Sequence, residues 1–205
     1  TLTGPSYSAF TNTVGSGSLT INFGTWSADP TSGGGQTHTA NSLDSITVNT
    51  TSTTTLTQLR DLINNAASDS DNDGKQDVLA SVIYDGTNYM LMLKSESGAS
   101  NEMKVTATSN LANTVNNVSY NYNATTSNMN QRVAGTNSAF RVDGISMTRE
   151  SNSISDLFDG FTLDLLTTNS SVSSIFKSES FPSDPSFFGE LENITIGGCS
   201  AMALK

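Results

Sequence analysis

Residues 46–95 carry an ordered series of patterns that restricts the fold more than any other part of the chain. Ile46 and Val48 alternate with threonine, as in a strand. Residues 55–66 then place apolar side chains at helical spacing, at Leu56, Leu59, Ile63 and Ala66. Residues 78–84 and 89–93 alternate again around the turn-forming sequence DGTN. The segment therefore predicts a strand, one amphipathic helix at about residues 55–67 and a β-hairpin, and it offers no catalytic residue.

The predicted helix has a clear start signal. Thr55 precedes it and Gln58 follows three residues later, which is the spacing of a capping box. In such a box the threonine hydroxyl accepts the Gln58 amide, and the Gln58 side chain accepts the Thr55 amide. Asn64 and Asn65 are weak helix formers, so we expect the helix to end soon after them.

This segment resembles the repeat module of bacterial flagellins and flagellar cap proteins that is named for an Ile-Asn (IN) pair, here Ile63-Asn64. The flanking sequences are similar to the filament cap family, hook-associated protein 2. They read GSGSLTINFGTWSAD at residues 15–29 and AFRVDGISMTRESNSISDLFDGFTLDLL at residues 139–166. The resemblance covers about residues 15–166. Past residue 166 the pattern of the family stops.

The resemblance implies a structural, non-enzymatic protein. It would form the outer plate of the flagellar filament cap, promote flagellin assembly at the filament tip and contribute to adhesion. Its partners would be flagellin and other copies of the cap protein, outside the cell, after export by the flagellar secretion apparatus. The helical legs of the family are missing from this sequence, so we expect the isolated chain to be mainly monomeric.

The patterns predict a mainly β fold with minor α content, built from antiparallel sheets and one helix in two small lobes. The first lobe is assigned to residues 17–107, and the asparagine-rich residues 108–131 are interpreted as a connector. The second lobe is assigned to residues 132–168, with residues 1–16 as a candidate addition that would make it discontinuous. Within it, residues 153–158 suggest one helical turn. Residues 169–205 lack a sustained apolar pattern and are treated as a tail of uncertain order.

Charge and cysteine content exclude several classes of function. The net charge is −10, with 19 acidic and 9 basic residues. Nucleic-acid binding requires clustered Lys and Arg, so neither nucleic acid nor an anionic membrane is an expected partner. The single cysteine, Cys199, cannot form an intramolecular disulfide. No apolar run approaches the length of a membrane-spanning helix.

One motif, DSDNDGKQD at residues 69–77, suggests a metal ligand set. Carboxylates at alternate positions, followed by a glycine that permits a sharp turn, can surround calcium with oxygen ligands. An EF-hand loop would require a glutamate at its twelfth position, where this chain has Ala80. The order instead resembles the calcium loops of thrombospondin-type repeats. The predicted ligands are Asp69, Asp71, Asp73, Lys75 through its backbone carbonyl, and Asp77. A solvated polar turn is the alternative, and both interpretations stay open.

No catalytic residue and no required cofactor are predicted, and calcium would only stiffen the loop. His38, the only histidine, falls in a glycine- and threonine-rich stretch and is expected to be an exposed loop residue. No nucleophile elbow is present. The second functional hypothesis is a calcium-stabilised adhesion or carbohydrate-binding β-module for host surface glycans. It would use the loop at residues 69–77 with Trp26, Tyr84 or Tyr89, although Trp26 is interpreted first as a core residue.

Overall fold

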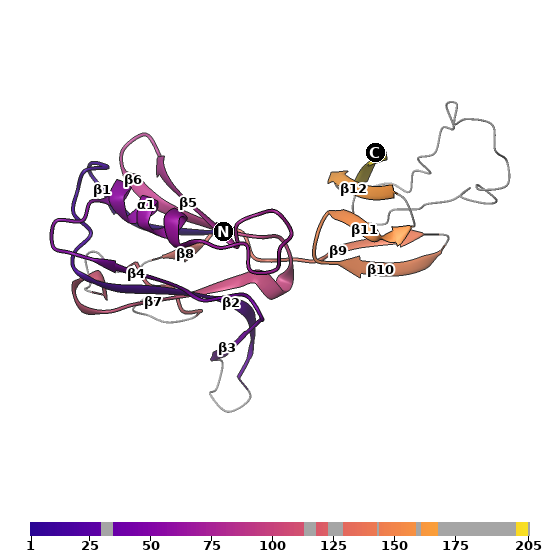
Figure 1. The fold of residues 1–205 in the computed structure, drawn as a ribbon, viewed down its shortest axis with the longest axis horizontal. Helices are drawn as coiled ribbons and strands as arrows, with labels where there is room; N and C mark the ends of the chain where they lie inside the picture. The colour runs from indigo at the N-terminus through magenta and orange to yellow at the C-terminus, as the bar shows by residue number, and fades with distance from the viewer. Residues whose placement is uncertain are drawn as a thin grey trace. The chain divides into compact units, whose positions relative to one another are not determined.

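The computed structural model describes residues 1–29, 35–112, 118–122, 129–142, 144–158, 161–167 and 200–204. They fall in two compact units, residues 1–135 and residues 136–205, which are described separately (Figure 1). Among the described residues, strands dominate both units and the first unit contains one α-helix. The sheets are antiparallel throughout, so the predicted mainly β fold with minor α content is confirmed.

The first unit contains a four-stranded sheet, here called sheet I. Its strands lie in the order β5 (Val78–Tyr84), β6 (Tyr89–Ser95), β1 (Leu2–Tyr7) and β8 (Asn130–Gln131). β5 and β6 form the predicted hairpin, which closes where the Asp85 amide donates to the Asn88 carbonyl at 3.0 Å. Gly86 in this turn has φ +100°, a conformation that favours glycine. β1 lies between β6 and β8, so sheet I joins segments that are distant in sequence.

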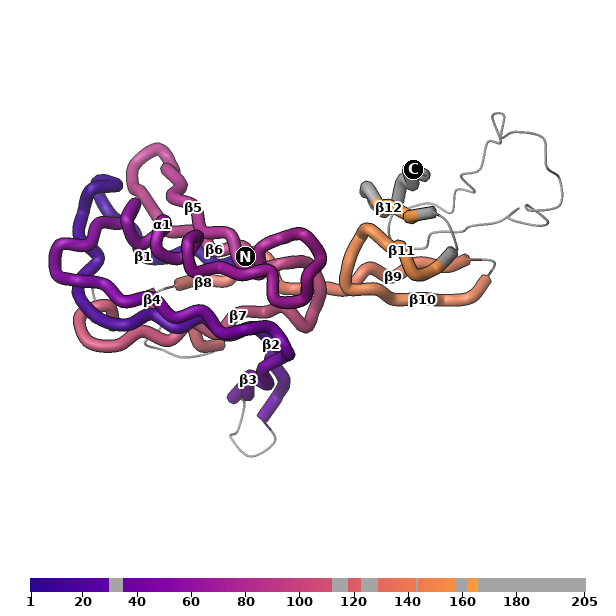
Figure 2. The backbone as a smooth tube through the Cα atoms, in the orientation of Figure 1, coloured from indigo at the N-terminus to yellow at the C-terminus, as the bar shows by residue number. Residues whose placement is uncertain are grey.

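A second sheet of the first unit, sheet II, is built around the long strand β2 (Gly17–Ala28). One edge of β2 pairs with β4 (Ile46–Thr50) and then with β3 (Gln36–Ala40), and its other edge pairs with β7 (Glu102–Ala107). Figure 2 shows β2 and β7 running side by side, as their pairing requires. Two 3-10 turns, η1 (Ala99–Asn101) and η2 (Ser109–Ala112), flank β7.

The helix α1 (Leu56–Ala66) connects β4 to the β5–β6 hairpin. Its capping box is present as predicted. The Gln58 amide donates to Thr55 Oγ1 at 3.3 Å, and the Thr55 amide donates to Gln58 Oε1 at 2.9 Å. The predicted apolar stripe is also confirmed, except that Ala66 at its end is exposed. Both sheets and α1 contribute to one core, whose most deeply buried members include Leu2, Leu19, Ile21, Phe23, Leu56, Leu59, Ile63, Leu91 and Leu93.

The second unit is smaller and carries two sheets. β9 (Ser138–Val142) pairs with β10 (Ile145–Arg149), and β11 (Ser153–Phe158), β12 (Phe161–Thr167) and β13 (Ser200–Leu204) form a three-stranded sheet. Its core consists of Phe140, Val142, Ile154, Leu163 and Leu165. Asp143, expected in the β9–β10 turn, lies outside the described residues, whereas Gly144 beside it has φ +81°.

The structure corrects the predicted domain boundaries. Residues 1–16 do not join the second lobe, because β1 pairs with β6 and β8 inside the first unit. The described parts of residues 108–131 are no free connector either. Val118, Tyr120 and Met129 are buried in the core of the first unit, and the division between the units follows Gly135.

Two local expectations in the second unit are also corrected. Residues 153–158 form strand β11 instead of a helical turn, because Ser153 and Ile154 pair with Asp164 and Leu163 of β12. In the segment treated as a tail, residues 200–204 form β13, whose Leu204 lies opposite Leu163. Residues 168–199, with Cys199, lie outside the described part of the chain.

Candidate functional site

The loop at residues 67–77 connects α1 to β5 and carries the predicted cation ligands. α1 ends where the Ala67 amide donates to the Ile63 carbonyl at 2.8 Å. The base of the loop is closed by the Asp77 amide, which donates to the Ser68 carbonyl at 2.8 Å. Between these points Asn72 and Gly74 have φ +61° and +88°. Asn and Gly tolerate this left-handed conformation, so the sequence fits the tight course of the backbone.

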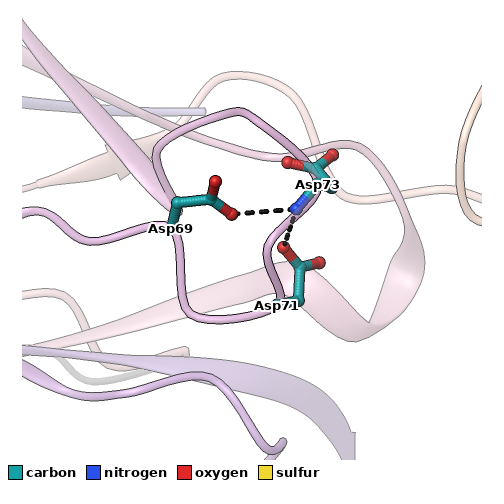
Figure 3. Close-up of side chains that lie close together, drawn as sticks. All are labelled: Asp69, Asp71 and Asp73. Carbon is teal, nitrogen blue, oxygen red and sulfur yellow. Dashed lines mark hydrogen bonds between the residues drawn. The ribbon is translucent and has the colours of Figure 1, made fainter.

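Three of the predicted ligands converge at the tip of this loop. Asp69, Asp71 and Asp73 are all exposed, and each offers an oxygen within 4.8 Å of those of the other two. Figure 3 shows that the Asp73 amide lies between the other two carboxylates. It donates to Asp69 Oδ1 at 2.9 Å and to Asp71 Oδ1 at 3.2 Å. The Gly74 amide adds a bond to Asp69 Oδ2 at 3.0 Å. Backbone amides thus stabilise part of the negative charge of the cluster.

Asp77, a further predicted ligand, is placed differently. Its side chain is fully buried, and both carboxylate oxygens accept hydrogen bonds from within the loop. Oδ1 accepts the Ser70 amide at 3.2 Å, and Oδ2 accepts the Ser68 hydroxyl at 3.2 Å together with the Ser70 hydroxyl. Asp77 therefore holds the base of the loop in shape and does not join the cluster at the tip.

Lys75 was predicted as a backbone ligand, but its side chain acts on the same cluster. The Lys75 ammonium forms an ion pair with Asp73, and the Lys75 amide donates to Asp73 Oδ1 at 2.8 Å. The hydrogen bond from this ammonium lowers the pKa of Asp73, and the same bond to the Asp73 carboxylate raises the pKa of Lys75. An internal cation therefore offsets one of the three carboxylates.

Glu96 also belongs to this site, although the sequence analysis missed it. The β5–β6 register sets Ser95 opposite Val78, so Glu96 follows directly beyond the hairpin on the side where the loop ends. Its Oε1 atom is buried and has no hydrogen-bond partner within the part of the chain that the structure describes. The pKa of Glu96 is raised to about 7, first by burial and then by the charges of Asp73 and Asp71. Projecting the hairpin register one residue further could have identified it.

The arrangement has the chemistry of a cation or proton site. Carboxylate oxygens on an exposed loop are suitable ligands for a hard cation, and crowded carboxylates also bind protons more tightly. None of these five carboxyl groups, nor the Lys75 ammonium, is a nucleophile held by a general base. The calcium interpretation and the polar-turn interpretation both remain predictions.

The other residues singled out from the sequence lie on strands of the first unit. Trp26 packs against the core, as interpreted, and its Nε1 donates to the Met103 carbonyl at 3.3 Å. His38 is not an exposed loop residue: it lies half-buried on β3, with Nε2 3.1 Å from the Glu102 carbonyl oxygen. Tyr84 and Tyr89 lie together, with ring centroids 4.7 Å apart. Within the described residues, no helix has the length and apolar character that a bilayer crossing requires.

Of the comparisons with known proteins, the one with solved structures gives matches. No protein-family model matches the sequence, and no curated protein matches it. Among solved structures, the D2–D3 domains of the flagellar cap protein FliD from Escherichia coli are 25% identical, with a TM-score of 0.58. That match covers 76% of this chain and 70% of the E. coli D2–D3 chain.

The D2–D3 domains of the flagellar cap protein from Serratia marcescens are 27% identical, with a TM-score of 0.58, over 83% of this chain and 81% of that one. A longer E. coli structure, which also contains D1, has a TM-score of 0.60 and 26% identity over 80% of this chain, but this chain spans only 42% of it. In fold, then, this chain is similar to the D2–D3 domains of flagellar cap proteins.

Proposed function

We propose that this chain is the outer plate portion of a flagellar filament cap, which promotes flagellin assembly at the filament tip. The observation that carries the proposal is the match to two D2–D3 structures, which this chain covers over 70% and 81% of their length at 25% and 27% identity. Its partners would be flagellin and further copies of the cap protein, outside the cell. A fold likeness alone does not establish function, so the proposal requires a test in cells.

The proposed mechanism is passive support. The first unit has a continuous core, and a capped helix links sheet II to the hairpin of sheet I. Such a body can hold a fixed surface toward an incoming subunit without any covalent chemistry. The loop at residues 67–77 is consistent with this role, because its hydrogen bonds fix its shape.

We also propose that residues 46–95 form an IN-type module. Two features of the pair support this assignment. Ile63 is fully buried in the core, and the side chain of Asn64 bonds to both backbone groups of Ala80, at 2.7 and 2.9 Å. Ile63 packs the helix against the core, and Asn64 bonds the helix to β5 of the hairpin. The pair would therefore fix the position of the helix relative to the hairpin.

The test is complementation in a flagellated cell that lacks its own cap protein. The whole chain is spliced between the helical arms of that cell's cap protein, and filament length is measured by microscopy. We expect filaments to grow. The matched control carries Leu59→Asp, which places a carboxylate in the core and should abolish growth. An exported, folded chimera that grows no filaments, beside a restored native cap that does, would sink the proposal.

The alternative of a calcium-stabilised adhesion or carbohydrate-binding module stays a prediction. It requires retention of the chain on host surface glycans that depends on calcium and is lost in Asp71→Asn. A cap plate requires no such retention. Measuring binding to a glycan surface with calcium and with a chelator separates the two hypotheses.

A further inference from the structure

Strand β5 lies at one edge of sheet I and lacks the usual protections against pairing with another chain. Its sequence VLASVIY contains no charged residue and no proline, and its seven residues pair with β6 without a bulge. Leu79 on this strand is also 50% exposed. Exposed, regular, apolar edge strands promote edge-to-edge association. The hazard would be greatest in an assembly that holds many copies side by side.

The backbone groups open to such pairing can be identified from the hairpin register. In an antiparallel pair, successive residues point their amide and carbonyl alternately toward the partner strand and away from it. Ala80 bonds to Asn64, so its groups point away from β6. The same alternation directs the groups of Val78, Val82 and Tyr84 toward the open edge. A neighbouring strand would have to bond to these four residues.

Asn64 occupies the second of these four positions. Its Nδ2 donates to the Ala80 carbonyl at 2.9 Å, and its Oδ1 accepts the Ala80 amide at 2.7 Å. A carboxamide has the same donor and acceptor as a peptide group, so Asn64 takes the place of one residue of an added strand. α1 keeps it there, because Ile63 beside it is buried in the core. A strand added beside β5 could therefore not form hydrogen bonds to Ala80, and its row of bonds to β5 would be interrupted at that residue.

One edge of sheet II, β7, shows a similar arrangement. β7 pairs with β2 on one side, and on its other side Val105 exchanges two backbone hydrogen bonds with Tyr120, at 2.9 and 2.8 Å. The opposite edge of sheet I, β8, is only two residues long. Filling the middle of an edge and shortening an edge both reduce strand addition.

We propose that Asn64 guards the edge of sheet I, so that strand β5 of one copy cannot pair with a strand of another copy. The biological reason for this protection rests on the proposed role in a multi-copy cap. The effect of Asn64 on strand β5 is a property of the isolated chain. It can therefore be tested whether or not complementation succeeds.

The test compares Asn64→Ala with Asn65→Ala. The same substitution is made at adjacent helix positions, but Asn65 is exposed. Molar mass is measured by size-exclusion chromatography with light scattering over a concentration series. Amide exchange of Ala80 and Val82 is followed in parallel. We expect Asn64→Ala to self-associate at least about tenfold more tightly than Asn65→Ala. The Ala80 and Val82 amides should become more protected as the concentration of Asn64→Ala rises.

Two further variants keep the result interpretable. Thr55→Ala removes the cap of the same helix and leaves Asn64 intact, so it shows what lost stability alone does to association. Should Asn64→Ala unfold, the double variant Asn64→Ala/Asn65→Ala is compared with Asn65→Ala, because a second alanine favours the helix. Self-association equal to that of the controls, with Ala80 and Val82 exchange independent of concentration, would overturn the proposal.

Discussion

The imidazole of His38 lies edge-on to the indole of Trp26, with the ring centroids 4.7 Å apart. The two residues are directly opposite on β3 and β2, and both reach backbone carbonyls of β7, at Glu102 and Met103. They therefore attach the far end of the β2–β3 ribbon to the strand on the other side of β2. Burial, as the largest cause, lowers the pKa of His38 below its usual value of 6.5.

This pair predicts a pH-dependent loss of stability. Because the folded state depresses the pKa of His38, the unfolded chain binds the proton more readily. The contribution to stability is therefore complete above about pH 6.5 and falls as the pH drops through the lowered pKa of the folded state. Thermal melts at several pH values would measure it, with His38→Gln as a variant that cannot titrate. An NMR titration of this single histidine giving a pKa above 6.5 would contradict the expectation.

Removing the helix cap should lower the stability of the first unit. Thr55→Ala leaves the Gln58 amide without its acceptor, and we expect a loss of about 1 kcal/mol in the free energy of unfolding. Urea titration monitored by circular dichroism measures the change. Thr53→Ala, at an exposed position of the same threonine run, is the control and should change stability by less than about 0.5 kcal/mol. Equal effects of the two substitutions would show that the cap adds nothing.

Tyr7→Phe should stabilise the chain. The Tyr7 hydroxyl is buried without a hydrogen-bond partner among the described residues, and burial raises its pKa to about 12. Removing an unsatisfied buried hydroxyl avoids its desolvation cost, so we expect the free energy of unfolding to rise by about 1 kcal/mol. Tyr84→Phe is the contrast, because that hydroxyl is exposed and donates to the Gly86 carbonyl at 2.7 Å. A destabilised Tyr7→Phe would reveal a partner for the hydroxyl.

Glu96 should make the first unit less stable as the pH rises toward and above neutrality. Its pKa in the folded state is raised to about 7 from the usual 4.5, so the folded chain holds its proton more tightly than the unfolded chain. The contribution is present below about pH 4.5 and is lost as the pH passes about 7. Glu96→Gln should therefore melt at a higher temperature than the native chain above neutral pH. Below about pH 4.5 the two should melt alike, and a difference that does not depend on pH would count against the assignment.

Calcium provides a separate test of the same loop. If Asp69, Asp71 and Asp73 hold the ion, we expect calcium to raise the melting temperature, because a ligand that binds only the folded state stabilises it. Asp71→Asn should remove this effect, whereas Asp44→Asn, an exposed residue outside the ligand set, should not. Calorimetric titration with calcium and then with magnesium measures the binding. No heat and no change in melting temperature would leave the polar-turn interpretation.

Local signals in the sequence predicted a large part of the fold. Thr55 and Gln58 fix the start of α1 with two hydrogen bonds that need no distant partner. The turn sequence DGTN fixes the β5–β6 register in the same way. Both features were predictable because the residues that form them are close together in the sequence.

What the sequence could not show depends on distant pairing. Tyr120 lies in an asparagine-rich segment that was interpreted as a connector, yet it is buried because it pairs with Val105. Ile154 lies in a strand and not in a helical turn because β12 is available as a partner. In the site, Asp69, Asp71 and Asp73 lie close together on one loop, as predicted. Glu96 lies near them because it follows β6, whose end pairs with the start of β5.

The position of β1 has a consequence for anyone who shortens this protein. The family resemblance begins near Gly15, which invites a cut there. Such a cut would delete β1, the strand between β6 and β8. Leu91 and Leu93 of β6 would then lose part of their packing in the core. A shortened domain that begins at Gly15 should therefore be recovered as insoluble material, whereas one that retains residues 1–14 and stops after Gly135 should fold alone.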